Sequence, residues 1–178
     1  MEALTSRLPR RGRPSRPSFA DAAEAHLDDV HAYLVYLVGD RDLAEDLTAE
    51  TFEKALARWR RFDPARGTAR TWLCQVARSV ALDHFRADER RRRRERAYAS
   101  REPTEERPPL VDGLSPALER ALRSLSAADR EVLGLRIVLE LDAGAVARLL
   151  GISTTACTTR LNRALHRLEE RMRDANAA

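Results

Sequence analysis

The sequence is poor in several residue types that would each support a different class of protein. Its 178 residues include two cysteines, four histidines, seven glycines and eight prolines, and aromatic residues make up 5%. Cys74 and Cys157 are too few for a disulfide framework or a zinc site. Low glycine and proline content argues against a fibrous chain. With 43% hydrophobic residues, the chain has enough apolar content for a globular fold instead of a disordered one.

Long apolar segments are also missing. No apolar run approaches the ~18 residues needed to cross a bilayer. The charged, proline-containing N-terminus lacks the apolar stretch of a secretory signal. We therefore expect no membrane insertion and a cytoplasmic location. At ~100–200 residues per domain, the length allows one domain or two small ones.

The low net charge of +4 arises because oppositely charged segments cancel. Residues 21–50 carry nine acids against one arginine, whereas residues 58–96 carry thirteen arginines against five acids. Residues 1–20 and 153–178 are also basic, with five arginines each against one and three acids. Such asymmetry indicates different partners for different segments, and the basic segments suit a polyanion.

Helical periodicity runs through the first half of the chain. Ser18 is placed to cap a helix that ends near Gly39. A second helical pattern starts near Asp42, and a third starts near Thr68, after a turn at residues 63–67. Apolar residues at spacings of three and four define the inner faces, and they include Leu27, Val30, Leu34, Leu37, Leu43, Leu47, Trp59, Phe62, Trp72, Leu73, Val76, Val80 and Phe85.

Structure restarts in the second half after a proline-rich segment. Ser115 and Ser126 are each placed to cap a helix, and the second of these carries Val132, Leu135 and Ile137. No stretch shows sustained β alternation. The sequence therefore predicts an all-α protein with two small helical domains joined by a flexible linker. The expected boundaries are a disordered basic arm at 1–17, domains at 18–96 and 115–174, and the linker at 97–114. The arm is either a solvated tail or a DNA contact.

The segment from Asp142 to about Met172 has the pattern of a helix-turn-helix. A short apolar helix is followed by Gly151, which suits the left-handed conformation of a tight turn, and Ser153 is placed to cap the next helix. Cys157 falls on the apolar side of that helix, where a core role is favoured. Its opposite side carries Thr155, Thr159, Asn162, Arg163 and His166, flanked by Thr158 and Arg160.

The residue types on that outward side are those that contact DNA. Asparagine offers a donor and an acceptor together, arginine can contact guanine or phosphate, and threonine can meet a thymine methyl group. The alternative interpretation is an ordinary α-hairpin with a polar surface. The joint presence of the turn, the cap and the polar face favours DNA binding.

Two groups of motifs resemble a known family. The stretches Asp42–Phe52, Arg60–Gly67, Thr71–Arg78 and Ala81–Arg86 resemble region 2 of bacterial extracytoplasmic-function (ECF) sigma factors. The stretch Ala128–Arg136 and the helix-turn-helix resemble region 4 of the same family. The resemblance covers roughly residues 20–172. It implies a factor that binds core RNA polymerase, recognises promoter DNA at the minus-35 and minus-10 elements, and opens the minus-10 element.

The resemblance also implies which residues do this work. The polymerase-docking segment falls on Leu43, Asp46, Leu47 and Glu50, where carboxylates lie beside an apolar patch; Ala49 stands where the family commonly has Gln. The minus-10 segment falls on Arg78, Ser79, Asp83, His84 and Arg86, and Ser79 stands where the family often has Asn. The minus-35 segment falls on Thr158, Thr159, Asn162 and Arg163, with Thr158 in place of a basic residue. Helical spacing and the cap position add Ser153, Thr155 and Arg160 as minus-35 candidates.

Three local features stay open between two interpretations. Trp72 and Phe85 could stack on single-stranded bases, although their spacing favours core packing. The Arg90–Arg94 run either follows a DNA backbone or is a charged helix end.

Partners and chemistry follow from the same comparison of motifs. The resemblance implies an anti-sigma factor as a further partner, and we expect a monomer when the protein is free. The alternative function is a stand-alone helix-turn-helix regulator. No glycine-rich phosphate loop, nucleophile motif or metal-ligand spacing occurs in the sequence. We therefore predict no enzyme, no catalytic residue, no cofactor and no metal site.

Overall fold

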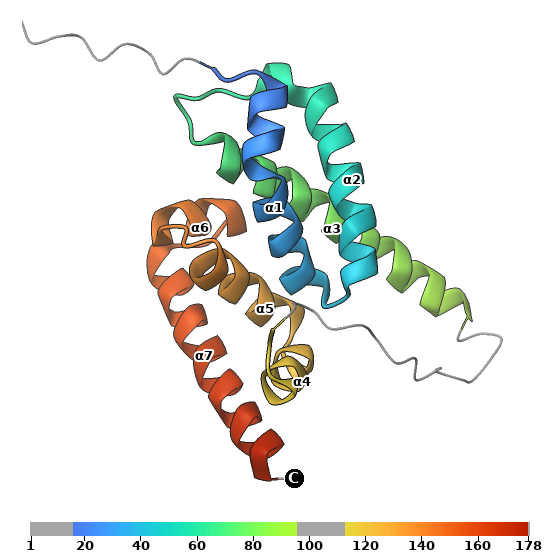
Figure 1. Ribbon diagram of the computed structural model, residues 1–178, viewed down its shortest axis with the longest axis vertical. Coiled ribbons are helices and arrows are strands. Elements are labelled where there is room, and N and C mark those ends of the chain that lie inside the picture. Colours follow the sequence, from blue (N-terminus) through green and yellow to red (C-terminus); the bar gives the residue numbers. More distant parts are fainter. Residues whose placement is uncertain (1–15, 96–112, 178) are drawn as a thin grey trace, which may run out of the picture.

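The computed structural model describes residues 16–95 and 113–177, and over these residues the chain is helical without a strand. The elements are α1 (Phe19–Val38), α2 (Arg41–Arg58), the 3-10 turn η1 (Trp59–Arg61), α3 (Ala69–Glu95), α4 (Pro116–Ser124), α5 (Ala127–Leu133), the π-helical turn η2 (Gly134–Val138), α6 (Ala143–Leu150) and α7 (Thr154–Ala177). Figure 1 shows α1–α3 grouped together and α4–α7 beside them. The all-α prediction is confirmed. Most of the predicted arm (1–15) and linker (97–112) lies outside the described residues.

The predicted helix caps form in both groups. The Asp21 N–H donates to Ser18 Oγ at 3.1 Å, and the Leu118 N–H donates to Ser115 Oγ at 3.2 Å. Gly39 ends α1 with a φ of 73°, in the left-handed region that favours glycine. Each cap satisfies a backbone group that the helix end leaves without a partner, so the helix boundaries are set locally.

A π-helical turn follows α5 directly. The Leu139 N–H donates to the Gly134 carbonyl at 2.9 Å, five residues back, where an α-helix would reach four residues back. Ile137, which the sequence analysis placed on this helix with Val132 and Leu135, is 53% exposed. A Cβ at Gly134 would lie 3.1 Å from Tyr36 Cβ, so glycine permits the close approach of η2 to α1.

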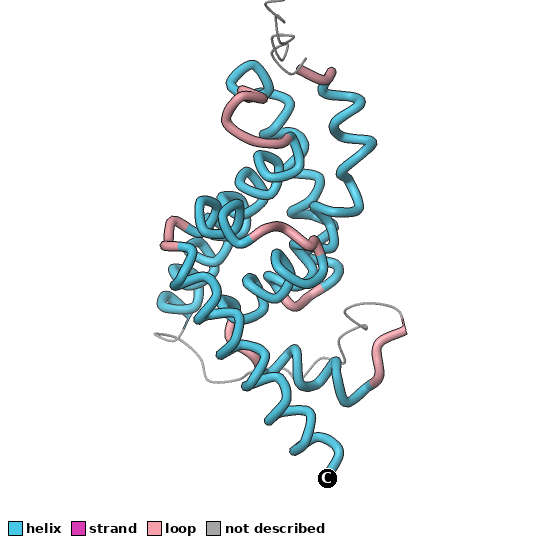
Figure 2. Tube along the Cα trace, turned by 90° about the vertical axis from the view of Figure 1, so that its left-hand side faces the viewer, coloured by secondary structure: helices cyan, strands magenta, loops and turns pink. Residues whose placement is uncertain are grey.

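One hydrophobic core runs through both helical groups. Buried residues from α1, α2 and α3 pack in the same cluster as buried residues from α4 to α7. Figure 2 shows the helices of the two groups packed into one body. The fully buried members of the cluster include Val30, Tyr33, Leu34, Leu73, Leu135, Val132 and Val146. Each group therefore buries apolar surface that it could not cover alone.

Polar contacts from α5 join the two groups at the side of α1. The Glu131 carboxylate accepts a hydrogen bond from Tyr33 Oη at 3.0 Å and pairs with Arg78 Nε at 2.7 Å. Arg130 donates to the carbonyls of Tyr36 and Leu37 at 2.9 and 3.3 Å. These carbonyls belong to the last turn of α1, which lacks helical partners for them. Arg130 of α5 therefore caps the C-terminal end of α1.

Candidate functional site

The acidic candidates for polymerase docking lie on the outer face of α2. Asp46 and Glu50 are exposed, and Glu50 pairs with Lys54 Nζ at 2.6 Å. Leu47 is 3% exposed and belongs to the core, and Leu43 is half-buried. The apolar patch that the sequence placed beside these carboxylates therefore faces inward for the most part.

A different apolar residue accompanies the acids on α2. Leu56 is 59% exposed, the largest exposed fraction among the large hydrophobic residues that are exposed in the described chain. Asp46, Ala49, Glu53 and Leu56 follow one another at steps of three and four, so they share one exposed stripe. The sequence analysis missed Leu56, although that spacing from the acids was a signal that could have found it.

The candidates on α3 separate into two groups. Ser79, Asp83 and Arg86 are exposed, and Asp83 pairs with Arg86 at 3.0 Å. His84 is half-buried, with its ring centroid 6.3 Å from that of Phe85. Arg78 instead turns toward α5, where it pairs with Glu131.

The most enclosed hollow near these residues lies one to two helical turns earlier. It has a volume of about 350 Å³ and is formed by the loop between α2 and α3, the start of α3 and one side of α6. Its lining comprises Arg61, Phe62, Asp63, Arg66, Gly67, Thr68, Thr71, Trp72, Gln75, Arg148 and Leu149. Sequence analysis had assigned this loop to a turn and did not identify a site there.

The hollow combines positive charge with aromatic surface. Three arginines stand against one acid, Asp63, whose carboxylate accepts a hydrogen bond from the Ala65 N–H at 3.0 Å. The rings of Phe62 and Trp72 lie 5.9 Å apart, and Trp72 also packs edge-on against Trp59 at 5.5 Å. Trp72 is therefore part of the aromatic packing, as its spacing favoured, and it also lines the hollow. Arginine beside aromatic rings is the combination that binds single-stranded nucleic acid.

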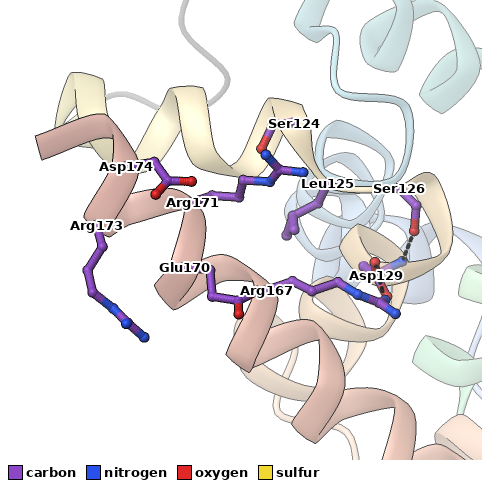
Figure 3. Close-up of a pocket in the computed structure, with 9 residues that line it drawn as sticks. All are labelled: Ser124, Leu125, Ser126, Asp129, Arg167, Glu170, Arg171, Arg173 and Asp174. Atoms are coloured by element: carbon purple, nitrogen blue, oxygen red, sulfur yellow. Dashed lines mark hydrogen bonds and ion pairs between the residues drawn. The ribbon is translucent and has the colours of Figure 1, made fainter. Parts of the chain in front are cut away.

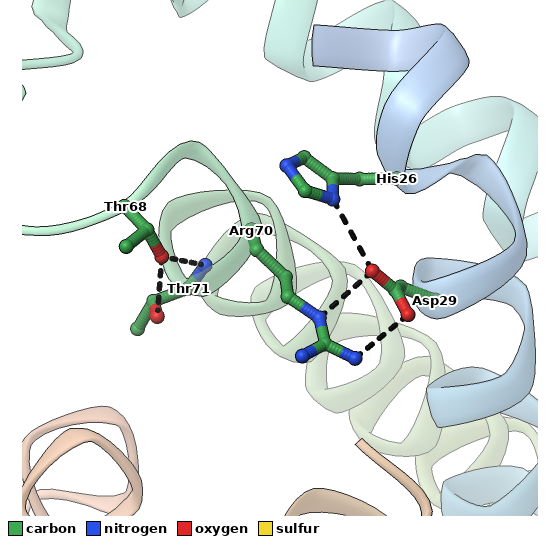
Figure 4. Close-up of polar contacts among 5 residues, drawn as sticks. All are labelled: His26, Asp29, Thr68, Arg70 and Thr71. Carbon is green, nitrogen blue, oxygen red and sulfur yellow. Dashed lines mark hydrogen bonds and ion pairs between the residues drawn. The ribbon is translucent and has the colours of Figure 1, made fainter. Parts of the chain in front are cut away.

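A polar cluster holds the start of α3 against α1 (Figure 4). The Asp29 carboxylate lies 2.7 Å from both Nε and Nη2 of Arg70 and 3.2 Å from His26 Nδ1. Thr68 caps the helix, because its Oγ1 accepts from the Thr71 N–H at 3.2 Å. Since Arg70 is anchored to α1, the neighbouring turn that lines the hollow is held in a defined orientation.

The arginine run at the end of α3 is exposed but partly neutralised. Arg91 and Arg92 both pair with Asp88, at 2.6 and 2.8 Å, and Arg93 pairs with Glu89 at 2.9 Å. Exposed pairs of this type are weak and exchange readily with other anions. Both interpretations of the run therefore remain compatible with its geometry.

The helix-turn-helix forms as the sequence predicts. Gly151 has a φ of 68°, and Ser153 caps α7 by accepting from the Ala156 N–H at 3.1 Å. Cys157 and Ala164 are fully buried on the inner side of α7. The candidate residues on the outer side are all exposed except Arg160, which is half-buried; they are Ser153, Thr155, Thr158, Thr159, Asn162 and Arg163.

A groove separates the start of α5 from the outer side of α7. It has a volume of about 620 Å³ and is lined by five of the candidates, Ser153, Thr155, Thr159, Arg160 and Arg163. Arg167 crosses the groove and lies 2.8 Å from both carboxylate oxygens of Asp129, which is 5% exposed. Thr158 and Asn162 do not line this groove. The structure therefore presents most of the α7 candidates as one surface.

Another groove, of about 960 Å³, lies between α4–α5 and the C-terminal half of α7 (Figure 3). Its charged side chains are balanced, with three arginines and three acids: Arg167, Arg171, Arg173, Asp129, Glu170 and Asp174. A surface without net charge attracts a polyanion only weakly. Size alone therefore does not make this groove a nucleic-acid site.

Within residues 16–95 and 113–177, no group of three or more His, Cys, Asp or Glu side chains could hold a metal ion. No helix in this part of the chain is long and apolar enough to span a membrane.

Comparison with known proteins assigns the class. The family model of Sigma-70 region 2 matches residues 22–92, and the model of Sigma-70 region 4 matches residues 115–168. The RNA polymerase sigma factor CarQ of Myxococcus xanthus is 32% identical over 88% of this chain and 90% of its own length. The chain belongs to the sigma-70 family of RNA polymerase sigma factors.

A second relative places the chain within that family. The ECF RNA polymerase sigma factor BldN of Streptomyces coelicolor is 31% identical over 88% of this chain, and the chain spans 61% of the length of BldN. The chain is thus a member of the ECF group. The fold matches that of the sigma factor RpoE of Bartonella quintana, solved in complex with the anti-sigma factor NepR. That match has a TM-score of 0.75 and 24% identity, over 87% of this chain and 96% of the other.

Proposed function

We propose that this protein binds core RNA polymerase, directs it to specific promoters and helps to open the minus-10 element. The observation that carries the proposal is that one chain exposes two surfaces whose side chains suit nucleic acid. One is the exposed side of α7, and the other is the stripe of α3 with its basic, aromatic hollow. A duplex reader and a single-strand reader on one chain fit a factor that both locates and opens DNA.

The acidic stripe of α2 is the proposed polymerase contact. Asp46 and Glu50 supply carboxylates to a basic protein surface, and Leu56 supplies the exposed apolar area beside them. Leu43 borders this stripe, and Leu47 supports the helix from the core. In promoter recognition, Ser79, Asp83, His84 and Arg86 form the minus-10 surface, to which Arg78 belongs once it is released from Glu131.

The exposed side of α7 is the proposed minus-35 reader. Asn162 and Arg163 are suited to base edges, and the hydroxyls of Thr155, Thr158 and Thr159 are suited to bases or phosphates. Ser153 and Arg160 lie at the start and the edge of the same surface.

The remaining parts of the proposal concern organisation and partners. The sigma factor acts as a non-catalytic, cofactor-free monomer in the cytoplasm, with residues 18–96 and 115–174 as its two working domains. An anti-sigma factor is a further proposed partner, supported by the fold match to a sigma factor that was solved with one.

Run-off transcription with core RNA polymerase tests the function. The template is a pool with randomised minus-35 and minus-10 segments, and the transcripts are sequenced. We expect a defined promoter to emerge that core polymerase alone does not use. The stand-alone regulator would replace this proposal if the protein bound a palindrome as a dimer and never joined polymerase.

Charge reversal tests the docking surface. Asp46→Lys with Glu50→Lys should weaken polymerase binding about tenfold or more, because two attractive contacts become repulsive. Asp28→Lys is the control, since Asp28 is an exposed acid on another helix, α1. Unchanged affinity in the double variant, measured by competition for core polymerase, would move the docking surface elsewhere.

A further inference from the structure

The turn that follows α2 carries positive charge that the fold does not neutralise. One acid, Asp63, occurs in this turn, and it accepts a hydrogen bond from the Ala65 N–H. The arginine run at the end of α3 differs, because Asp88 and Glu89 pair with it. Within the described residues, four exposed arginines of the turn form no ion pair; they are Arg58, Arg60, Arg61 and Arg66. Positive charge without an anion of its own attracts a polyanion.

The basic arm of residues 1–17 is fastened to the same turn. Arg16 Nη2 donates a hydrogen bond to the Trp59 carbonyl, and Arg16 Cζ lies 5.4 Å from the centroid of the Trp59 ring. A cation is favoured both at the C-terminal end of a helix and over an indole ring. Figure 1 shows the start of the described chain beside the end of α2. Arg16 therefore fixes the point at which the preceding residues leave the folded body.

The residues that precede Arg16 are basic. Residues 1–15 lie outside the described part of the chain, and their sequence has one acid, Glu2, against four arginines: Arg7, Arg10, Arg11 and Arg13. A chain spans at most ~3.6 Å per residue, so the Cα atom of Arg13 stays within ~11 Å of that of Arg16, and the Cα atom of Arg7 within ~32 Å. The anchor thus keeps these arginines next to the unpaired arginines of the turn.

The turn also adjoins the start of α3. The rings of Trp59 and Phe62 stack at 4.8 Å, and Phe62 lines the hollow together with Arg61 and Arg66. The guanidinium of Arg16 is therefore separated from that hollow by two stacked rings. DNA that lies on α3 is within reach of the anchored arm.

We propose that the arm, anchored by Arg16 at Trp59, binds the phosphate backbone of promoter DNA beside the minus-10 element. The contact adds affinity without base preference, because arginines that follow a backbone neutralise phosphates. This inference rests on the proposed promoter function, and it assigns the arm one of the two roles that its composition left open.

The test measures how salt concentration affects the binding of holoenzyme to a duplex promoter fragment. In a plot of the logarithm of the binding constant against that of the salt concentration, each phosphate contact contributes a slope of about −0.9. Arg11→Gln with Arg13→Gln should therefore make the slope shallower by about 1 to 2 and leave the selected promoter sequence unchanged. The matched control is Arg171→Gln with Arg173→Gln, which removes two exposed arginines from α7 and should leave the slope as it is.

A double-mutant cycle tests the anchor itself. Arg16→Ala should weaken promoter binding about threefold or more in the otherwise unchanged chain, because the arm is no longer held beside the DNA. The same change should have a smaller effect once Arg11 and Arg13 are glutamine. If Arg16 were only a helix cap, Arg16→Ala would lower the urea midpoint of the free protein and leave promoter binding unchanged.

The other outcomes are distinguishable. An unchanged salt slope in the Arg11 and Arg13 variant would make the arm a solvated tail, and the promoter function would stand. A loss of affinity for core polymerase in the absence of DNA would show that the arm binds polymerase, which contradicts the proposal. Additive effects in the cycle would show that Arg16 does not direct the arm. If the unmodified holoenzyme selects no promoter, the proposed function fails and the role of the arm fails with it.

Discussion

The two helices that we propose as promoter readers, α3 and α7, are positioned in different ways. In the C-terminal group, α7 is positioned by its immediate neighbours in sequence, the left-handed Gly151 and the Ser153 cap. In the N-terminal group, the start of α3 is positioned by Asp29, which lies 41 residues from Arg70 along the chain. A surface that neighbouring residues position can be identified from the sequence. A surface that distant segments position can be identified only from the three-dimensional structure.

The shapes of the two surfaces differ as well. The α7 face exposes polar side chains along a helix, which suits the edges of an intact duplex in the major groove. The α3 surface includes a hollow lined by aromatic rings, which suits a base outside the duplex. This difference fits the proposed division of work, in which α7 reads duplex DNA and α3 contacts the opened strand.

The largest expected effect tests whether the N-terminal and C-terminal groups share one hydrophobic core. Leu34→Ala in α1 and Leu135→Ala in η2 remove fully buried side chains, and each should cost about 3 kcal/mol of unfolding free energy. Both tryptophans, Trp59 and Trp72, belong to the N-terminal group, so their fluorescence during urea unfolding reports on that group alone. We expect Leu135→Ala to shift this signal too.

The control is Leu27→Ala, because Leu27 is 49% exposed and should change stability by less than about 0.5 kcal/mol. If Leu135→Ala left the urea midpoint of the tryptophan fluorescence unchanged, the two groups would unfold separately.

A double-mutant cycle measures the polar link between the groups. Glu131 is nearly buried and has two partners from the other group, Tyr33 and Arg78. Arg78→Met leaves the carboxylate without its cation and should cost about 2 kcal/mol, a value reduced by the partial exposure of Arg78. The double variant Arg78→Met with Glu131→Leu should lose less than the two single variants added together. Strict additivity of the urea-derived free energies would show that the two side chains are not coupled.

Substitutions on α7 test the division of work. Asn162→Ala and Arg163→Ala should each weaken holoenzyme binding to duplex promoter about tenfold, because each removes a base or phosphate contact. The rate of strand opening from the bound state, followed by permanganate reactivity, should stay the same. Arg173→Ala is the control on the same helix. If the variants slowed opening and left duplex affinity intact, α7 would not be the duplex reader.

The smallest expected effect on stability near neutral pH comes from two buried groups that ionise only at alkaline pH. Burial raises the pKa of Tyr33 well above its usual value of 10.0, and the nearby Glu131 carboxylate raises it further. Burial also raises the pKa of Cys74 from 9.0 to about 12. Both groups resist ionisation only in the folded state, so their stabilisation is complete below pH 9 and is lost progressively above it.

We therefore expect urea midpoints that are flat between about pH 7 and 9 and that fall between about pH 9 and 11. Tyr33→Phe should have a lower midpoint at neutral pH, because Glu131 loses a hydrogen bond, and a shallower alkaline decline. An equal decline in both proteins would assign the pH dependence to other groups.

Much of the fold could be predicted from sequence because it depends on short-range chemistry. The caps at Ser18, Ser115 and Ser153 and the left-handed glycines at 39 and 151 act within one helical turn. The exposed side of α7 follows from helical spacing alone. Ile137 is exposed although the sequence analysis listed it among the apolar residues of its helix, because its spacing from Val132 and Leu135 places it on another face.

The parts that sequence did not reveal all depend on contacts between distant segments. Leu47 and Leu56 both lie on α2, and only the packing of that helix decided that the first is buried and the second exposed. Arg78 was placed on a promoter surface by its position in a motif, but its partner Glu131 lies 53 residues away. The hollow around Gln75 requires a loop, a helix and a side of α6 together.

By itself, the sequence determined the class of protein, the helices and the two segments that are proposed to read promoter DNA. Periodicity, caps and motifs are local properties of the chain, so they survive without tertiary information. The tertiary structure alone decided that the two groups share one core and that a hollow forms between the α2–α3 loop, the start of α3 and α6. Both depend on which distant side chains meet, and the balance of burial and pairing that selects those contacts is a property of the whole fold.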